Sequence, residues 1–137
     1  MERILVDTNV VLDLLGNREE FLQEAKELFT QGDKREVRLC VSSLTMATTY
    51  YILSRQLKRN ETRKVMKRFR QLAEVVGVDD KIIDLALDSD FNDFEDAIQY
   101  YCALENKVGL IITRNQKDFK HSKIPVLSAR EYMGMKN

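Results

Sequence analysis

Four aspartates in this sequence have the residue type and surroundings expected of metal ligands: Asp7, Asp93, Asp96 and Asp118. Asp7 ends the first apolar run, Asp93 and Asp96 are three residues apart where a helical pattern begins, and the fourth follows the last long apolar run. Close carboxylates without Lys or Arg partners repel one another by roughly 4 kcal/mol per pair, so such a group usually holds a cation. Mg2+ and Mn2+ prefer carboxylate oxygens. We therefore expect these four residues to hold a divalent cation such as Mg2+.

Local structure offers a second explanation for each aspartate. Asp is a preferred N-cap residue, so Asp7 also fits the start of a helix at residues 8–15. Asp93 and Asp96, with Cβ atoms about 5–6 Å apart on one helix face, also suit a first helical turn, where the helix dipole favours acids. Asp118 alone fits a helical turn without function. The joint placement of the four is what favours a metal site.

Short apolar runs bounded by polar residues predict the elements that would position these side chains. Strands are expected at residues 3–6, 37–42, 75–78 and 109–113, with an edge strand at 124–127, where proline is tolerated. Helical patterns separate them, at residues 9–15, 17–32, 43–57, 60–73, 80–87, 93–105 and after 128. This alternation indicates an α/β fold, a three-layer α/β/α sandwich with a central parallel sheet of four to five strands. The carboxyl ends of parallel strands share one edge, so the aspartates are expected to converge there.

Cap residues give the expected helix boundaries. The expected caps are Asn17 with Glu20 as a capping box, Gly32 as a helix end, Ser43 or Thr45, Asn60, Asp79 or Asp80, and Ser128 with Glu131 as a second capping box.

Length and composition indicate one globular domain, residues 1–137. With 44% hydrophobic and 32% charged residues, the chain is not of the disordered class, and no apolar run approaches the ~20 residues of a membrane span. The first residues do not resemble a signal peptide. Two cysteines and one histidine suit neither a disulfide framework nor a zinc site, so Cys40 and Cys102 are expected to be buried thiols. We expect a cytoplasmic protein without a membrane partner.

The formal net charge of zero conceals a division along the chain. Residues 54–70 contain eight Lys or Arg and one Glu, whereas residues 79–96 contain eight Asp or Glu and one Lys. This division suits a protein that brings an anionic polymer to one face and holds cations on another. A basic helix that simply faces water explains the first segment equally well. Tyr50, Tyr51 and Tyr100 are candidates for stacking on unpaired bases, although aromatic residues at helical spacing more often belong to the core.

Three segments together resemble the PIN domain family, which includes the VapC toxins of toxin–antitoxin pairs. They are ILVDTNV at residues 4–10, DFEDA at 93–97 and ITRNQKDF at 112–119, and their order and spacing cover nearly the whole chain. The resemblance implies an α/β/α sandwich and a Mg2+- or Mn2+-dependent endoribonuclease that cleaves RNA. By position, Asp7, Asp96 and Asp118 match the metal-binding acids of the family. The residues expected near the substrate are Asn9, Thr48, Thr113, Arg114 and Asn115.

One position departs from the family pattern. The family usually has a glutamate in the helix after the second strand, where this chain has Thr48, and no acid occurs between Ser42 and Asn60. A subgroup with the Asp-Phe-Glu-Asp-Ala segment is expected to share a polar residue there. Loss of one carboxylate would weaken metal affinity, and Asp93, one turn before Asp96, is the expected substitute.

Two other functions follow from the same residues. A catalytically weak or inactive PIN module that binds RNA or a protein partner is the alternative suggested by Thr48. A phosphatase of the haloacid dehalogenase type also begins with a strand and an aspartate, but it needs a second aspartate where Asn9 stands. For a toxin of the family, the resemblance implies a homodimer and a small antitoxin protein that inserts into the acidic groove.

Overall fold

The first strand, β1 (Arg3–Val6), shows why this chain forms a sheet that is covered on both faces. In the computed structural model, which describes residues 1–136, the side chains of Ile4, Leu5 and Val6 are completely buried. Successive side chains of a strand point to opposite faces, and accordingly Ile4 and Val6 belong to one apolar cluster and Leu5 to another. A strand buried on both faces has to lie inside a sandwich.

The sheet contains five parallel strands in the order β3-β2-β1-β4-β5. The other four strands are β2 (Arg38–Ser42), β3 (Glu74–Val76), β4 (Leu110–Ile112) and β5 (Val126–Leu127). The expected edge strand is confirmed as β5, and the carbonyl of Pro125 accepts a hydrogen bond from Ile111 N at 3.0 Å. Because β1 is central, the residue that follows it lies in the middle of the carboxyl edge.

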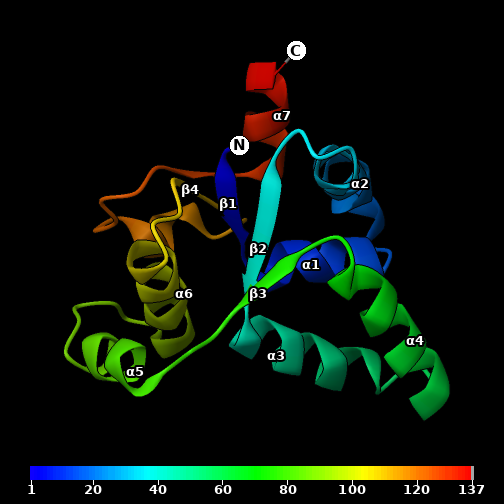
Figure 1. Cartoon of the computed structure of the whole chain (residues 1–137), viewed down its shortest axis with the longest axis horizontal. Helices are drawn as coiled ribbons and strands as arrows, with labels where there is room; N and C mark the ends of the chain where they lie inside the picture. The colour runs from blue at the N-terminus through cyan, green and yellow to red at the C-terminus, as the bar shows by residue number, and fades with distance from the viewer. Residues whose placement is uncertain (137) are drawn as a thin grey trace.

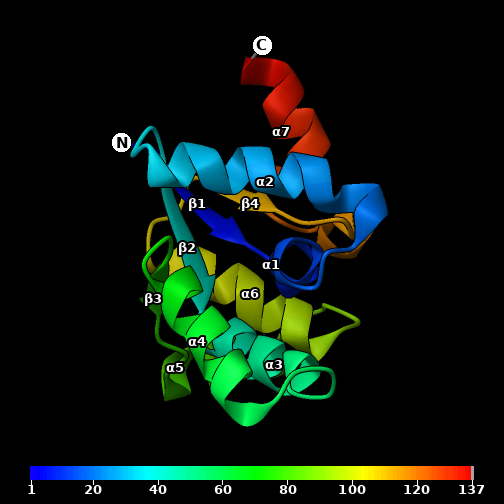
Figure 2. The same cartoon turned by 90° about the vertical axis from the view of Figure 1, so that its right-hand side faces the viewer.

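Helices cover both faces of the sheet, which confirms the predicted α/β/α sandwich (Figure 1). One face is covered by α1 (Thr8–Leu15), α2 (Glu19–Asp33), α4 (Arg59–Arg70) and α7 (Ala129–Lys136). The other face is covered by α5 (Asp80–Leu87) and α6 (Phe94–Glu105). The helix α3 (Ser43–Leu53) follows β2 and lies with α4 at the end of the molecule opposite α7 (Figure 2).

Several predicted helix boundaries are wrong, each for a local physical reason. Helix α2 begins at Glu19, and Asn17 instead has a φ of 51° in the tight turn after α1, a conformation that Asn tolerates. Helix α4 begins before Asn60, because Glu61 accepts a hydrogen bond from Lys58 N at 3.2 Å and closes the first turn there. The predicted end of α2 at Gly32 is within one residue of the observed end at Asp33, and a Cβ atom at Gly32 would approach Leu39 Cδ1 to 2.7 Å.

Other cap assignments agree with the structure or shift by one residue. Asp79 caps α5, and Ser128 with Glu131 forms the predicted capping box of the last helix, with both hydrogen bonds at 3.0 Å. The cap of α3 is Ser42, whose Oγ accepts from Thr45 N at 3.0 Å. Cys40 and Cys102 are free, buried thiols as predicted, and burial raises the pKa of each to about 11. No helix within residues 1–136 is long and apolar enough to cross a membrane.

A buried ion pair ties α1 to the turn that follows β4. The Asp13 carboxylate, 2% exposed, accepts from Arg114 Nε at 2.8 Å and from Arg114 Nη2 at 3.1 Å. The guanidinium carbon of Arg114 lies 4.1 Å from the centre of the Phe21 ring, and Arg18 approaches Asp13 at 3.8 Å. Burial raises the pKa of Asp13, and the contacts with Arg114 oppose that shift. The pair therefore fixes the turn after β4 against the helix that begins beside Asp7.

Replacing Arg114 by Met is expected to lower the free energy of unfolding by about 3 kcal/mol, because the Asp13 carboxylate would stay buried without its main partner. Arg130→Met is the matched control, since the Arg130–Glu24 pair has the same 2.8 Å distance but Arg130 is 73% exposed. That change should cost less than about 1 kcal/mol. Urea denaturation of the two variants measures both values, and equal losses would contradict the role assigned to Asp13 and Arg114.

Candidate active site

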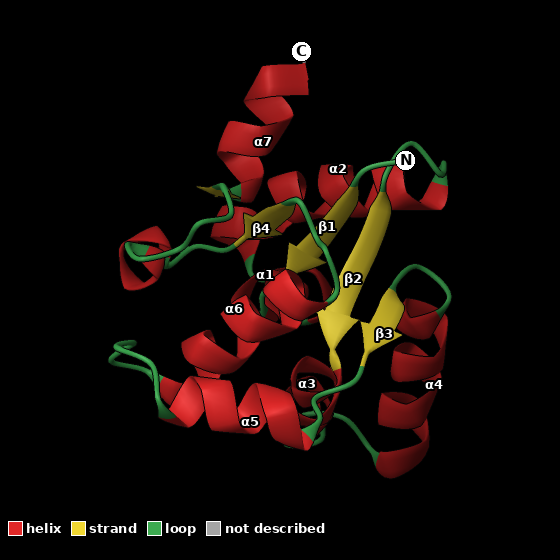
Figure 3. Ribbon diagram, turned by 60° about the vertical axis from the view of Figure 1, so that its left-hand side comes forward, coloured by secondary structure: helices red, strands yellow, loops and turns green. Residues whose placement is uncertain are grey.

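Asp7 lies at the carboxyl edge of the sheet, directly after the central strand. Its backbone N–H donates to the carbonyl of Ile112 at 2.9 Å, and the pairing of Val6 with Ile112, continued by one residue, places Thr113 beside Asp7. Figure 3 shows β1 and β2 running toward α1 and α3 at this edge. Asp7 is also the N-cap of α1, since its Oδ1 accepts from Thr8 N at 2.8 Å. Asp7 therefore does cap α1, which was one of the two explanations for this residue, and its carboxylate also makes further contacts.

The Asp7 carboxylate is 5% exposed and is held by uncharged donors. Thr113 Oγ1 donates to Oδ2 at 2.7 Å, and Gln99 Nε2 donates to Oδ1 at 3.2 Å. Together with Thr8 N, these donors use three of about four acceptor positions on the carboxylate, and they leave one position on Oδ2 open. Burial raises the pKa of Asp7, and the three hydrogen bonds lower it, with burial the larger effect. No Lys, Arg or His within residues 1–136 forms a salt bridge with this group.

Asp96 faces the same region from the first turn of α6. It is 9% exposed, and its backbone N–H donates to Oδ1 of the N-cap residue Asp93 at 3.0 Å. The pKa of Asp96 is raised to about 7, first by burial and then by the negative charges of Asp7, Asp93, Asp118 and Glu95. The structure therefore brings the four predicted aspartates into one electrostatic neighbourhood.

Asp118 reaches this neighbourhood from a short 3-10 helix, η1 (Gln116–Phe119), after β4. The following residue, Phe119, is 2% exposed and its ring packs edge-on against Phe91, which in turn packs against Tyr100 of α6. This aromatic contact anchors η1 beside α6, while Asp118 itself is exposed. Asp93 is exposed as well, so these two carboxylates form the rim of the site.

The polar residues after β4 and in α1 form a second group of contacts around Asp7. Thr113 Oγ1 accepts from Asn115 N at 3.1 Å and from Asn9 Nδ2 at 3.4 Å, while Asn9 Oδ1 accepts from Arg114 N at 3.3 Å. Thr113 is completely buried behind Asp7, and Arg114 is paired with Asp13. Asn115 is exposed and Asn9 is partly exposed. In this structure, then, Thr113 and Arg114 support the site, and the substrate contacts expected of all four residues remain predictions.

The α3 side of the site contributes hydroxyl groups and no carboxylate. Thr45 Oγ1 lies 2.9 Å from Thr8 Oγ1, 3.2 Å from Ser42 Oγ and 2.7 Å from Gln99 Nε2. Thr48 is half-buried on the same helix, one turn further along. Sequence reasoning missed Thr8, Thr45 and above all Gln99. The available signal was a glutamine three residues after Asp96, on a helix face that is otherwise mostly apolar.

The arrangement of carboxylates fits a cation that is only partly coordinated by protein. Within residues 1–136, no group of three or more His, Cys, Asp or Glu side chains is close enough together to enclose an ion. Mg2+ usually binds through one or two carboxylates and completes its shell with water and substrate phosphates. Asp7, with one open acceptor position, and Asp96 are the two buried carboxylates of the site, and Asp93 and Asp118 are the exposed ones.

The chain is similar to known proteins over most of its length. A family model described as "PIN domain" matches residues 3–117. "Ribonuclease VapC1" of Aquifex aeolicus (strain VF5) is 26% identical over 136 residues, covering 96% of this chain and 93% of that protein. Two solved structures share the fold. DNA-bound VapBC from Salmonella typhimurium has a TM-score of 0.71 at 20% identity, covering 94% of this chain and 99% of that chain. A toxin–antitoxin complex from Klebsiella pneumoniae has a TM-score of 0.68 at 23% identity, covering 92% and 97%.

The raised pKa of Asp96 predicts how the stability of the metal-free protein depends on pH. Between its ordinary value of 3.8 and about 7, the unfolded chain releases this proton and the folded protein retains it. The contribution of Asp96 to stability therefore falls as pH rises from about 4 to 7 and then levels off.

Asp96→Asn removes this contribution. At pH 8 with a chelator, the variant should be more stable than the parent by at least about 1 kcal/mol, a Tm rise of roughly 3–5 °C, and the gain should vanish near pH 4. Asp84→Asn, an exposed position on α5, is the control and should show no such dependence. Thermal melts across this pH range test the prediction, and an Asp96→Asn variant that is less stable at pH 8 would refute it.

Proposed function

The chain belongs to the PIN domain family, and on this basis we propose that it is a Mg2+- or Mn2+-dependent endoribonuclease and the toxin of a toxin–antitoxin pair. The observation that carries the proposal is the convergence of Asp7, Asp96, Asp93 and Asp118 without a cationic partner within residues 1–136. Similarity to a protein named as a ribonuclease supports RNA as the substrate.

The residues of the site have distinct tasks in this proposal. A divalent ion bound by Asp7 and Asp96, with help from Asp93 and Asp118, would activate water and neutralise charge on the scissile phosphate. Thr113, Gln99 and the backbone N–H of Thr8 orient the Asp7 carboxylate and leave one acceptor position on Oδ2 open. Asn9 and Asn115, which are not completely buried, can contact the substrate, while Thr113 acts from behind.

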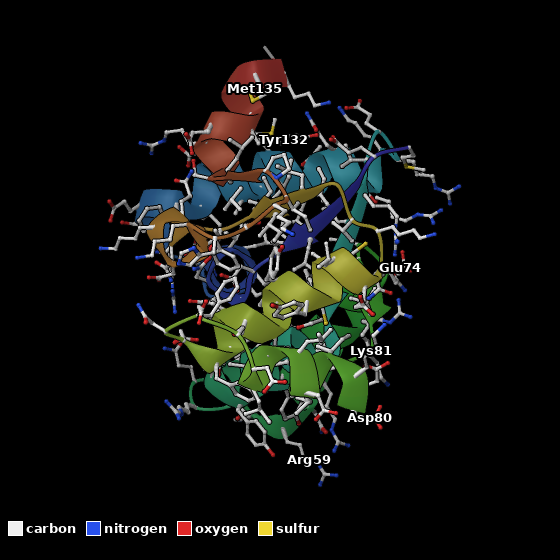
Figure 4. The ribbon with its side chains drawn as sticks, turned by 90° about the vertical axis from the view of Figure 1, so that its left-hand side faces the viewer. Arg59, Glu74, Asp80, Lys81, Tyr132 and Met135 are labelled. Atoms are coloured by element: carbon white, nitrogen blue, oxygen red, sulfur yellow. The ribbon has the colours of Figure 1, made fainter. Side chains whose placement is uncertain are left out.

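The basic helix α4 is the proposed contact for the RNA backbone. None of the salt bridges within residues 1–136 uses a Lys or Arg of α4, so their charges are available to phosphates. A hollow of about 330 Å3 between α3 and α4 combines apolar and cationic side chains: Met46, Tyr50, Arg63, Met66, Lys67 and Arg70. Figure 4 shows Arg59, at the start of α4, at the end of the molecule opposite Tyr132 and Met135 of α7. Helix α3 runs from Thr45 at the site to Tyr50 at this hollow, so one strand of RNA can reach both.

The aromatic candidates for base stacking separate in the structure. Tyr100 is 4% exposed and belongs to the core, whereas Tyr51 is 69% exposed beside Tyr50. Base stacking is therefore proposed only for Tyr50 and Tyr51.

The proposed partners follow from the solved structures to which the chain is similar. These structures are of DNA-bound VapBC and of a toxin–antitoxin complex, which supports a small antitoxin as the partner of this chain. We also propose a homodimer and a cytoplasmic location. The competing function is a PIN module that binds RNA or protein without cleavage, and the observation that favours it is the absence of any acid from α3. Calorimetry with Mn2+ separates the two, because the binding module has no need of an ion.

Asp7→Asn tests the catalytic proposal with little change of shape, since Asn can also cap α1. We expect cleavage of single-stranded RNA in Mg2+ or Mn2+ to fall at least about 100-fold, because the change removes a charged ligand of the ion. Asp84→Asn should cleave at the parental rate. The measurement is the rate of product formation on a labelled oligonucleotide, and equal residual rates in the parent and Asp7→Asn would assign the cleavage to a contaminant.

Neutralising two cations of α4 tests the RNA contact. Arg63→Gln combined with Lys67→Gln should weaken RNA binding in chelator and reduce the slope of log affinity against log salt by about 1.4, since each phosphate contact on a single strand contributes about 0.7. Lys26→Gln on α2 combined with Lys34→Gln at the C-cap of that helix is the charge-matched control. Fluorescence anisotropy at several salt concentrations gives both slopes. The same slope for the two double variants would show that α4 faces only water.

A further inference from the structure

Gln99 is an almost completely buried polar residue of the site, and its burial needs an explanation. The residue lies on α6 and is 1% exposed. Its Nε2 atom is 2.7 Å from Thr45 Oγ1, 3.2 Å from Asp7 Oδ1 and 3.4 Å from Thr8 Oγ1. A buried amide that lacks full hydrogen bonding is costly, so an apolar residue would be favoured here if packing were the only requirement.

The hydrogen-bond pattern fixes which end of the amide faces Asp7. An ionised carboxylate can only accept, so the NH2 group must point at it. The amide oxygen, Oε1, is buried and has no partner within residues 1–136, and the same is true of Thr49 Oγ1 on α3. The orientation of the Gln99 amide is thus set by the two shortest contacts of its NH2 group, to Thr45 and Asp7. Its Oε1 atom is left without a hydrogen bond in this orientation.

These two contacts link three elements at the point where Asp7 is held. Thr45 belongs to α3, Gln99 to α6, and Asp7 is the cap of α1. Helix α3 contributes no carboxylate, so on this side the Asp7 carboxylate meets an amide that is itself supported by a threonine hydroxyl.

We propose that Gln99 is a positioning residue: it holds Asp7 Oδ1 in place so that the open acceptor position on Oδ2 faces the ion and the substrate. Thr45 supports Gln99 in this role. At 1% exposure, Gln99 does not touch the substrate. The inference rests on the proposed nuclease function and adds to it the group that orients the central ligand.

Gln99→Met tests the inference, because Met has a similar length and no donor. Loss of a group that orients a metal ligand typically costs 10–100-fold in metal affinity or activity. We expect the Kd for Mn2+ to rise at least about tenfold, and kcat to fall by a similar factor at saturating Mn2+. The KM for RNA should stay within twofold, since the substrate contacts are untouched. Thr49→Val is the matched control, because it removes a buried hydroxyl that has no hydrogen-bond partner within residues 1–136, and it should change none of these values.

Thr45→Val provides a second test if Gln99→Met does not fold. It removes the hydroxyl that supports Gln99 without touching Asp7, and it should shift the Mn2+ Kd and kcat in the same direction by a smaller factor. Calorimetry with Mn2+, thermal melts and steady-state kinetics are measured for all proteins. If the parent cleaves RNA and binds Mn2+ but both variants keep Kd and kcat within twofold, Gln99 only packs and the inference fails while the nuclease stands. If the parent neither cleaves nor binds Mn2+, the proposed function fails and the role of Gln99 falls with it.

Discussion

The Asp7 carboxylate is buried at the end of the central strand, and no cationic side chain of residues 1–136 forms a salt bridge with it, so the rest of the site has to stabilise it in another way. A carboxylate taken out of water has to be compensated by donors. They come from the backbone of α1, from Gln99 on α6 and from Thr113 after β4. Each of these elements must be docked firmly for the group to be held. The two apolar clusters on either face of the sheet provide that docking, and the Asp13–Arg114 pair adds a polar tie across α1.

Charge is distributed unevenly around this carboxylate. The other acids of the site arrive from α6 and η1, whereas α3 offers only hydroxyl groups. The basic helix α4 packs beside α3, where Arg63 Nε donates to Tyr50 Oη at 3.4 Å. The division of charge along the sequence thus corresponds to a division in space: the acids lie on the α6 and η1 side of the site, and the cations lie on α4, on the far side of α3. A polyanion that lies across α3 would contact the cations of α4 as well as the carboxylates, which suits the proposed binding and cleavage of RNA.

Much of this arrangement could be predicted from sequence because it depends on local patterns. Branched apolar runs gave the strands, and the chain order of strands and helices implied a parallel sheet whose edge collects Asp7, Asp96 and Asp118. Prediction failed where long-range contacts decide. Asn17 is a residue type preferred at helix caps, but it takes a left-handed conformation in the turn before α2. Gly32, one residue before the end of α2, also makes room for Leu39, which the sequence does not indicate. Gln99 and Asp13 are hard to recognise from the sequence, because their partners Asp7 and Arg114 lie 92 and 101 residues away.

The central position of β1 has a consequence for how the protein forms. Asp7 reaches Thr113 across 106 residues and Gln99 across 92, and the pairing of β1 with β4 spans a similar distance. Contacts between residues so far apart in sequence form late, because closing the long loop between them costs conformational entropy before the contact stabilises the chain. During synthesis, the amino-terminal residues emerge with Asp7 but without the donors that Gln99 and Thr113 supply. Whatever chemistry this site performs is therefore absent from the growing chain and begins only when the last third of the sequence has folded against the first strand.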